Sequence, residues 1–266
     1  MVWKFISYFL FSFEWRRIYG IELSDTRWCP KIIKDCVRSL LQIGCEKFKC
    51  FSEIFPLFKE ALHETQDTQI IDLCSGAGGP WKHFEEDLMN IGVTKVVLTD
   101  INPQEGQLEG DFYEHCSYSV DARAVPRSAK GFRTMFSAFH HFKENEKIQI
   151  IRDSISSNEG IGIFEVSERN IWSILFAATF MIPTNMIVCP MIKPRKLSFF
   201  LLTYSLIVPL IMIFDGVMSC LRTQTVDEMK EMISVIPDHE TYDWKIGKIY
   251  QLPLSTLYII GTPKKK

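Results

Sequence analysis

The sequence lacks an excess of charge of either sign. Its 30 Lys and Arg residues stand against 32 Asp and Glu residues, so the formal net charge is -2 at pH 7. Nucleic-acid binding depends on a basic surface that neutralises phosphates. We therefore expect no nucleic-acid partner.

The eight cysteines lack the spacings of a metal site. They contain no C-x-x-C pair, and no histidine lies at zinc-finger spacing from them. We interpret them as reduced thiols of a cytosolic protein and predict no bound metal. Cys45 and Cys50 are near enough in the sequence to lie side by side, but packed free thiols are the commoner outcome in a reducing compartment.

The N-terminus lacks the cleavage site of a secretory signal. Residues 1–13 are aromatic and apolar, and no small-residue site precedes the segment 14–17. A bilayer span takes about 20 residues, so this stretch is also too short to cross a membrane. An interfacial helix and a helix docked on the domain both remain open.

From residue 68 onward, short β-branched runs alternate with polar helical stretches, as in a parallel sheet covered by helices. We predict an α/β fold with a doubly wound sheet, a terminal antiparallel strand pair and N-terminal helices. Strands are expected at 69–73, 95–99, 116–120, 133–137 and 161–166, and the terminal pair at 242–252 and 254–261. Helices are expected at 81–90, after Pro103, around 126–129 and at 144–157.

Two uncharged runs, 171–192 and 197–214, are separated only by Lys193–Lys196. A chain of this size has little room to bury them beside a complete α/β core, so we favour an inserted apolar helical hairpin associated with a membrane over buried core helices. The intervening basic residues favour a re-entrant or interfacial hairpin over two spans. We therefore predict three regions: an N-terminal helical or cap region at 1–67, an α/β domain at 68–169 and 222–266, and the hairpin at 170–221.

A glycine-rich turn follows the first expected strand, within Ile70–Trp81. Gly76 and Gly78 allow the backbone to approach a ligand closely. The third glycine of G-x-G-x-x-G is absent and Asp72 lies inside the strand. Both features argue against a dinucleotide pyrophosphate.

Two further acids follow expected strands. Asp100 lies about 20 residues beyond the glycines, where a carboxylate accepts hydrogen bonds from two ribose hydroxyls. Ile101 would then lie against the adenine face. The other interpretation is that Asp100 caps the turn before Pro103. Asp121 and the Ala122 backbone are placed to read the adenine edge, and all three acids are expected to meet at the carboxyl edge of one sheet.

With these motifs, the sequence resembles the class I S-adenosylmethionine-dependent methyltransferases over roughly residues 68–165 and 222–262. It is most similar to bacterial-type members with a Cys-Ser-Gly-x-Gly-Gly-Pro-Trp turn and a Trp-Cys-Pro segment, here Trp28–Pro30. The resemblance implies a Rossmann-like fold and S-adenosyl-L-methionine as the cofactor. The implied cofactor-binding residues are Asp72, Cys74, Gly76, Gly78, Asp100, Ile101, Asp121, Ala122 and Ser137.

Methyl transfer from a sulfonium is an in-line displacement that alignment accelerates without a metal. A hydroxyl or protonated amine acceptor needs a base, and His140 or His141 is the best-placed candidate because imidazole titrates near neutral pH. Local packing is the other interpretation of these histidines. Glu165 is a third catalytic candidate that would orient the acceptor, with a salt bridge to Arg152 or Arg169 as its alternative.

These expectations combine into one hypothesis: methyl transfer to a lipophilic or membrane-delivered small molecule, such as a lipid headgroup, quinone or isoprenoid, at the membrane surface. The expected partners are membrane lipids and that small molecule. The cofactor is cytosolic, so the α/β domain is expected on the cytoplasmic side. The alternatives are a catalytically silent membrane scaffold, a methyltransferase acting on a protein, and a nucleotide-binding oxidoreductase.

Overall fold

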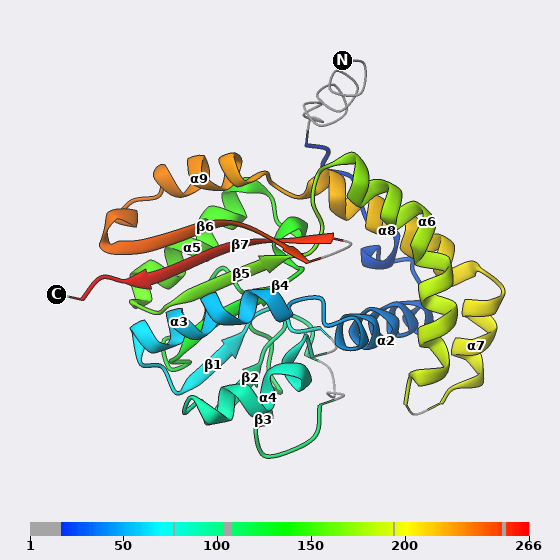
Figure 1. Cartoon of the computed structure of the whole chain (residues 1–266), viewed down its shortest axis with the longest axis horizontal. Coiled ribbons are helices and arrows are strands. Elements are labelled where there is room, and N and C mark those ends of the chain that lie inside the picture. The colour runs from blue at the N-terminus through cyan, green and yellow to red at the C-terminus, as the bar shows by residue number, and fades with distance from the viewer. Residues whose placement is uncertain (1–16, 77, 104–107, 194, 252–253, 266) are drawn as a thin grey trace. The chain divides into compact units, whose positions relative to one another are not determined.

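The chain folds into two units, which Figure 1 shows in colours that follow the sequence. The first consists of the segment up to Gly44 together with Ser167–Thr225, and the second of Cys45–Val166 together with Val226–Lys266. This computed structural model describes residues 17–265 apart from 77, 104–107, 194 and 252–253. The alternatives considered for residues 1–13 lie outside the described residues.

A seven-stranded sheet forms the centre of the second unit, in the order β3-β2-β1-β4-β5-β7-β6. Strands from β3 to β5 are parallel, whereas β7 is antiparallel to both β5 and β6. The predicted α/β class with a terminal antiparallel pair is confirmed. The strands are β1 (Gln69–Asp72), β2 (Lys95–Leu98), β3 (Tyr113–His115), β4 (Phe132–Phe136), β5 (Ile161–Glu165), β6 (Tyr242–Gln251) and β7 (Leu254–Pro263).

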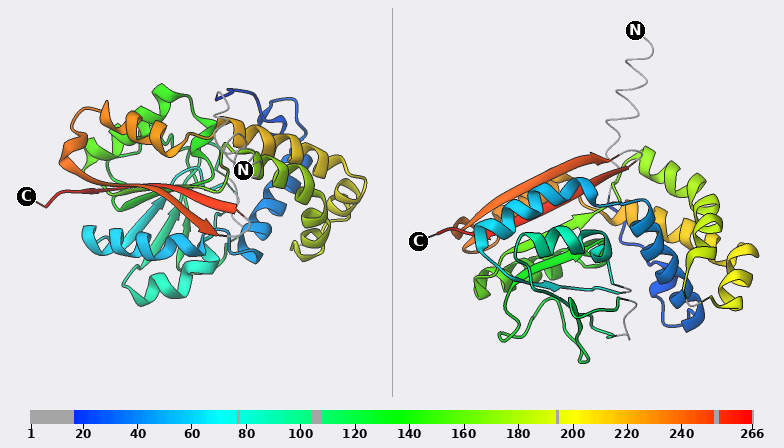
Figure 2. Two further views of the ribbon diagram at one scale, coloured as in Figure 1. Left: turned by 45° about the horizontal axis from the view of Figure 1, so that its top comes forward. Right: turned by 60° about the horizontal axis from the view of Figure 1, so that its bottom comes forward.

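Helices cover both faces of this sheet, as the two views of Figure 2 show. Along β1, Ile70 packs with the helices of one face and Ile71 with those of the other, because successive side chains of a strand point to opposite sides. The first face is covered by α3 (Phe55–Thr65) and α4 (Trp81–Asn90), and the second by α5 (Glu144–Ser157) and α9 (Val226–Ser234).

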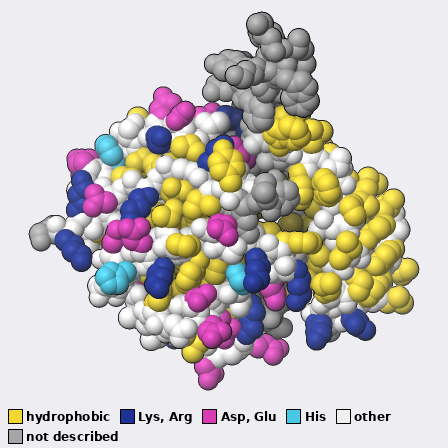
Figure 3. Space-filling view, viewed as in Figure 1, with side chains coloured by type: hydrophobic (Ala, Val, Ile, Leu, Met, Phe, Trp, Pro, Cys, Tyr) yellow, Lys and Arg dark blue, Asp and Glu magenta, His cyan; other side chains and the backbone are white. Residues whose placement is uncertain are grey.

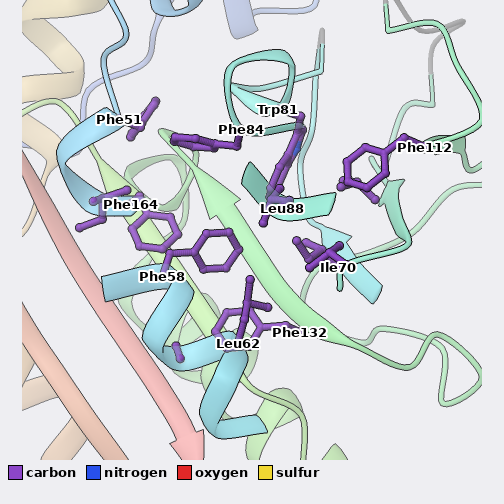
Figure 4. Packing of buried hydrophobic residues seen from close by; sticks show 14 of the residues in the cluster. Phe51, Phe58, Leu62, Ile70, Trp81, Phe84, Leu88, Phe112, Phe132 and Phe164 are labelled. Atoms are coloured by element: carbon purple, nitrogen blue, oxygen red, sulfur yellow. The ribbon is translucent and has the colours of Figure 1, made fainter. Parts of the chain in front are cut away.

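An aromatic cluster holds α3 and α4 on the sheet (Figure 4). The ring of Phe58 lies 5.5 Å from that of Phe132, 5.8 Å from that of Phe164 and 6.2 Å from that of Trp81. Burying each such ring contributes about 2–3 kcal/mol, and edge-to-face pairing adds roughly 1 kcal/mol. Since Trp81 begins α4, this cluster also holds the C-terminal end of the glycine-rich turn.

Two predicted elements of this unit differ from the structure. β3 lies at Tyr113–His115 and not at 116–120, because the buried side chains are those of Phe112 and Tyr113, whereas residues 117–119 are exposed. Residues 126–129 form a turn and not a helix. The short helix expected after Pro103 falls largely on 104–107, outside the described residues.

The first unit is helical. Its apolar core consists of Cys36, Val37, Leu40, Val188, Cys189, Ile192, Phe199, Val208 and Met212. A left-handed residue, Leu206, separates α7 from α8, and the two helices are bent by 67°. The main helices are α2 (Lys31–Lys47, whose last turn belongs to the second unit), α6 (Ile171–Val188), α7 (Leu197–Tyr204) and α8 (Ile207–Arg222).

Polar bonds attach the segment before α2 to the C-terminal half of α8. The carboxylate of Asp215 accepts hydrogen bonds from the backbone N–H groups of Leu23, at 2.6 Å, and Ser24, at 3.0 Å. The Ser219 hydroxyl donates to Glu22 at 3.0 Å. The polar side chains near this end of α8 are thus satisfied within the unit, so its acids do not remain as unpaired buried charges.

The boundaries of the units differ from those expected. The predicted cap region at 1–67 is divided after Gly44, since α3 belongs to the sheet-containing unit. The reason is packing: Phe58, Ala61 and Leu62 of α3 are buried in the aromatic face of the α/β core. The hairpin shares a unit with the segment up to Gly44.

We expect Gly131→Ala to destabilise the protein more than Gly92→Ala. Both glycines have a positive φ, at +131° and +95°, but a Cβ at Gly131 would meet the Gln69 carbonyl oxygen of β1, whereas one at Gly92 meets nothing within 4 Å. The clash at position 131 should lower the free energy of unfolding by about 1–3 kcal/mol, in addition to the loss from the positive φ that both variants share. Chemical denaturation of the two variants measures the difference, and equal losses of stability would contradict it.

Candidate cofactor and active site

The turn between β1 and α4 has an unusual backbone. Cys74, Gly76, Gly78 and Gly79 all have positive φ, at 57°, 56°, 119° and 59°. For Cys74 this conformation is costly because its Cβ crowds the backbone, and such strain persists where surrounding bonds impose it. The turn is joined to β2 by the Ser75 N–H, which donates to the Thr99 carbonyl oxygen at 2.9 Å.

Asp72 ends β1 and is fully buried. Its carboxylate accepts a hydrogen bond from the Thr134 hydroxyl of β4 at 2.8 Å. Burial raises the pKa of Asp72 to about 6, although Trp81, Thr134 and Ser75 partly oppose the shift. Above that pH the carboxylate is a buried charge at the base of the glycine-rich turn.

Asp100 lies just beyond the end of β2. One carboxylate oxygen accepts a hydrogen bond from the Gly76 N–H at 3.1 Å, and the other from the Asn102 N–H at 2.8 Å. The contact with Asn102 is the turn cap that the alternative interpretation expected, and the contact with Gly76 joins Asp100 to the glycine-rich turn. A carboxylate oxygen has two lone pairs, so each retains one for a ligand. The next side chain, Ile101, is 51% exposed.

Asp121 does not directly follow a strand, since β3 ends at His115. Its carboxylate is bound by the Arg123 guanidinium at 2.7 Å, and Arg123 also contacts Glu146 at 2.7 Å. Arg123 holds the pKa of Asp121 below its usual range. A ligand that uses the Asp121 side chain must share it with Arg123, whereas the adjacent Ala122 is buried in the core.

The three acids nevertheless gather around one thiol. Burial first, and then the charges of Asp100, Asp72 and Asp121, raise the pKa of Cys74. Three carboxylates that follow β1, β2 and the segment after β3 therefore act on the same sulfur atom. All three acids thus lie near enough to Cys74 to affect its pKa, and their joint binding of one ligand stays a prediction.

Ser137 follows β4 at the same edge. It has φ of 45°, and its N–H donates to the Phe164 carbonyl oxygen at 2.8 Å. Among the described residues its buried hydroxyl has no hydrogen-bond partner. A strained residue with an unsatisfied buried hydroxyl is typical of a site that a ligand completes.

His140 and Glu165 form a buried pair beyond β4 and β5. The Nδ1 atom of His140 lies 2.6 Å from one Glu165 oxygen, and the His140 backbone N–H donates to the other at 3.1 Å. Burial disfavours the charged carboxylate, but His140, Lys147 and His141 hold the pKa of Glu165 below its usual range. The rings of His140 and His141 lie 4.2 Å apart. Of the three catalytic candidates, the structure thus joins two by direct hydrogen bonds.

Several contributing residues have no signal in the sequence. Thr134 of β4 acts on Asp72 of β1, and Lys147 of α5 acts on Glu165 of β5. Their residue types are common at surfaces and in helices, so spacing alone does not distinguish them. The tertiary contact is the only indication of their role.

A scan against protein-family models and a search of curated proteins each give no match. Among solved structures, the chain is similar to the methyltransferase domain of bacterial CtHen1, with a TM-score of 0.48, 9% identity, and 83% of this chain and 99% of that chain covered. It is similar to the plantazolicin methyltransferase BpumL in complex with SAH (0.47, 11% identity, 88% and 98% covered). It is also similar to human N-acetylserotonin methyltransferase in complex with SAM (0.49, 12% identity, 95% and 64% covered). Likenesses this low concern the fold and carry no information about the substrate.

The order of the sheet, its antiparallel β7 and the glycine-rich turn after β1 define a Rossmann-like α/β fold. Fold does not decide activity. The residues at the carboxyl edge of the sheet determine which chemistry this fold can perform.

Asp72→Asn should stabilise the folded chain more at neutral than at acidic pH. The folded pKa of about 6 exceeds the ordinary 3.8. Between these values the folded state retains a proton that the unfolded state has released, so the wild type loses stability as pH rises through this window. The asparagine is uncharged and still accepts from Thr134. Relative to wild type, its free energy of unfolding should rise by about 2 kcal/mol between about pH 4 and about pH 7.5.

Chemical denaturation across this pH range measures the change. The control is Asp87→Asn on the exposed face of α4, which should show no comparable dependence. A difference in free energy of unfolding between Asp72→Asn and wild type that does not change with pH would contradict the prediction.

Proposed function

We propose that this chain is an S-adenosylmethionine-dependent methyltransferase that acts at a membrane surface on a lipophilic small molecule. The observation that supports the proposal is the hydrogen bond that the Asp100 carboxylate, beyond β2, accepts from the Gly76 N–H in the glycine-rich turn after Asp72. One carboxyl edge then offers acceptors for hydroxyl and amino groups together with a closely approachable backbone, which suits a nucleoside.

Several of the predicted cofactor-binding residues support this assignment. Asp100 has an acceptor position left on each oxygen for the ribose hydroxyls, and the exposed Ile101 beside it offers an apolar face for adenine. Gly76 and Gly78 line the approach to the methionine part, and the Ser137 hydroxyl is available as a further polar contact. When bound, the sulfonium supplies an activated methyl group to a nucleophile aligned with it.

His140 is the proposed base for a hydroxyl or amine acceptor. In the neutral form of His140, the hydrogen bond to the charged Glu165 favours the ring proton on Nδ1, so Nε2 carries the lone pair that accepts a proton. Glu165 then stabilises the positive charge that develops on the ring. His141, whose ring lies against that of His140, remains a second candidate.

The membrane part of the proposal is supported by the surface of the first unit. The stretch Ile171–Met191 is long and apolar enough to cross a membrane, with a mean hydropathy of 1.7, and only 22% of its most apolar window is buried. Figure 3 shows hydrophobic side chains gathered over this unit. The exposed large ones of the hairpin are Trp172, Leu175, Phe180, Ile187, Met191, Leu197, Leu201, Tyr204, Ile207, Leu210 and Phe214.

Partial insertion fits this surface better than two spans. The C-terminal half of α8 carries Asp215, whose partners are backbone groups of the polar segment at Leu23 and Ser24, and that segment would have to enter the bilayer with it. At the opposite end of the hairpin, Lys193 and Lys196 are exposed, where they can reach anionic headgroups. We therefore propose a monotopic hairpin with the α/β unit on the cytoplasmic side.

Asp100→Ala should weaken binding of S-adenosylhomocysteine by about 100-fold, because two charge-assisted hydrogen bonds are lost. Isothermal calorimetry measures the affinity. Asp87→Ala, on the exposed face of α4, is the matched control and should bind like wild type. Unchanged affinity in a folded Asp100→Ala variant would remove the ribose assignment.

The double variant Leu197→Glu with Leu201→Glu should reduce flotation with anionic lipid vesicles by about tenfold or more, because both exposed side chains would otherwise be buried in lipid. Val235→Glu changes an equally exposed side chain of the α/β unit and should float like wild type. Flotation that is the same in all three proteins would contradict monotopic insertion.

The function itself is tested with purified full-length protein, a methyl-labelled donor and vesicles of a total lipid extract. Mass analysis should find label in the lipid fraction, and Asp100→Ala should abolish it. Label in protein would instead indicate a protein substrate. Cofactor binding without transfer to lipid or any cell extract would indicate a silent scaffold.

A further inference from the structure

Two backbone hydrogen bonds cap the C-terminus of α2. Lys49 has φ of 50° and donates its N–H to the Glu46 carbonyl oxygen at 3.3 Å, while the Cys50 N–H donates to the Cys45 carbonyl oxygen at 3.1 Å. This pair of bonds around a left-handed residue is the Schellman motif. The motif brings together the side chains of the two residues joined by its outer hydrogen bond, here Cys45 and Cys50.

The two thiols interact with each other. Their hydrogen bond lowers the pKa of Cys50 and raises the pKa of Cys45. Both residues are half-buried and pack against the aromatic cluster of the α/β core.

The other described cysteines lack this combination. Burial raises the pKa of Cys36 to about 11 and that of Cys220 to about 12, which keeps both thiols protonated. Cys116, which is also half-buried, bonds to a backbone oxygen, that of Tyr118. Selective oxidation is therefore expected at the α2 cap, since reactivity follows thiolate character and exposure.

We propose that Cys45 and Cys50 form a redox-active dithiol that hydroperoxides convert into a disulfide. The Cys50 thiolate attacks one peroxide oxygen and the O–O bond breaks, which leaves a sulfenic acid and a hydroxide or alkoxide; this takes up the proton that Cys50 released on ionisation and leaves as water or an alcohol. The Cys45 thiol then attacks the sulfenic sulfur, the S–S bond forms, and water leaves with the Cys45 proton. The two sulfur atoms together lose two electrons, which the peroxide gains.

The pair lies next to a chain of ring contacts that reaches the α/β core. Cys50 precedes Phe51, whose ring lies 4.9 Å from that of Phe136 at the end of β4. Phe136 in turn lies 5.2 Å from Trp81, the first residue of α4. The disulfide would therefore fix the turn at the end of α2. This turn positions the Phe51 ring, which Phe136 connects to Trp81 at the end of the glycine-rich turn. This modification site does not depend on the methyl-transfer proposal.

The test exposes reduced, full-length wild-type protein to hydrogen peroxide under native conditions, followed by alkylation, proteolysis and mass analysis. We expect a linked Cys45–Cys50 peptide that has lost two hydrogen atoms, that forms before any other cysteine is modified, and that dithiothreitol reverses. Cys36→Ser, which removes a buried thiol, should form the same linked peptide. Cys45→Ser should leave Cys50 as a sulfenic acid that dimedone traps.

Two results would overturn the proposal. In the first, both cysteines of the wild type remain as accessible to alkylation after peroxide treatment as before. In the second, they proceed to separate sulfinic acids without a linked peptide. Because the decisive measurement uses the wild type, poor folding of a variant does not affect it.

Discussion

Hydrogen bonds between the turn after β1 and the end of β2 hold the candidate site together. The Asp72 carbonyl oxygen accepts from both the backbone N–H and the hydroxyl of Thr99, at 2.9 Å and 2.8 Å. The Asp100 carboxylate then accepts from the Gly76 N–H across the gap between the two strands. A carboxylate held in this way is preorganised, so a ligand does not have to order it, and affinity is gained by avoiding that cost.

The two buried carboxylates of the sheet edge have opposite electrostatic surroundings. Asp72 is surrounded by neutral donors and by a second acid, Asp100, so burial raises its pKa to about 6. Glu165 is equally buried, but its neighbours His140 and Lys147 keep its pKa low. Environments that separate the pKa values of similar groups are a feature of acid-base sites, and here they separate a structural acid from the partner of a histidine.

The helical first unit combines a polar end with an apolar surface. Asp215, Glu22 and Ser219 satisfy one another or nearby backbone groups, so the polar side chains of α8 need no lipid-exposed partner. The remaining helix surface carries exposed Leu197 and Leu201 among many other apolar side chains. An apolar surface of this kind on a described helical unit calls for a partner, and a bilayer offers one that is uniformly apolar.

Local pattern predicted most of the regular elements. The helices at 81–90 and 144–157 and the strands beginning at Gln69 and Lys95 agree with the structure, because alternation and helical spacing report which side chains face a core. Two predictions from the pattern were wrong. The strand expected at 116–120 lies earlier, at β3, because the buried residues precede the predicted run, and the helix expected around 126–129 is only a turn that follows Pro126.

The sequence also identified the acids and glycines of the site, since a strand followed by a glycine-rich turn and an acid ending the next strand are local signals. It did not identify the partners that decide their chemistry. The pairing of Glu165 with His140 and the contact of Thr134 with Asp72 join residues 25 and 62 positions apart. Such contacts depend on strand order and on which side chains burial brings together, and only the folded chain specifies both.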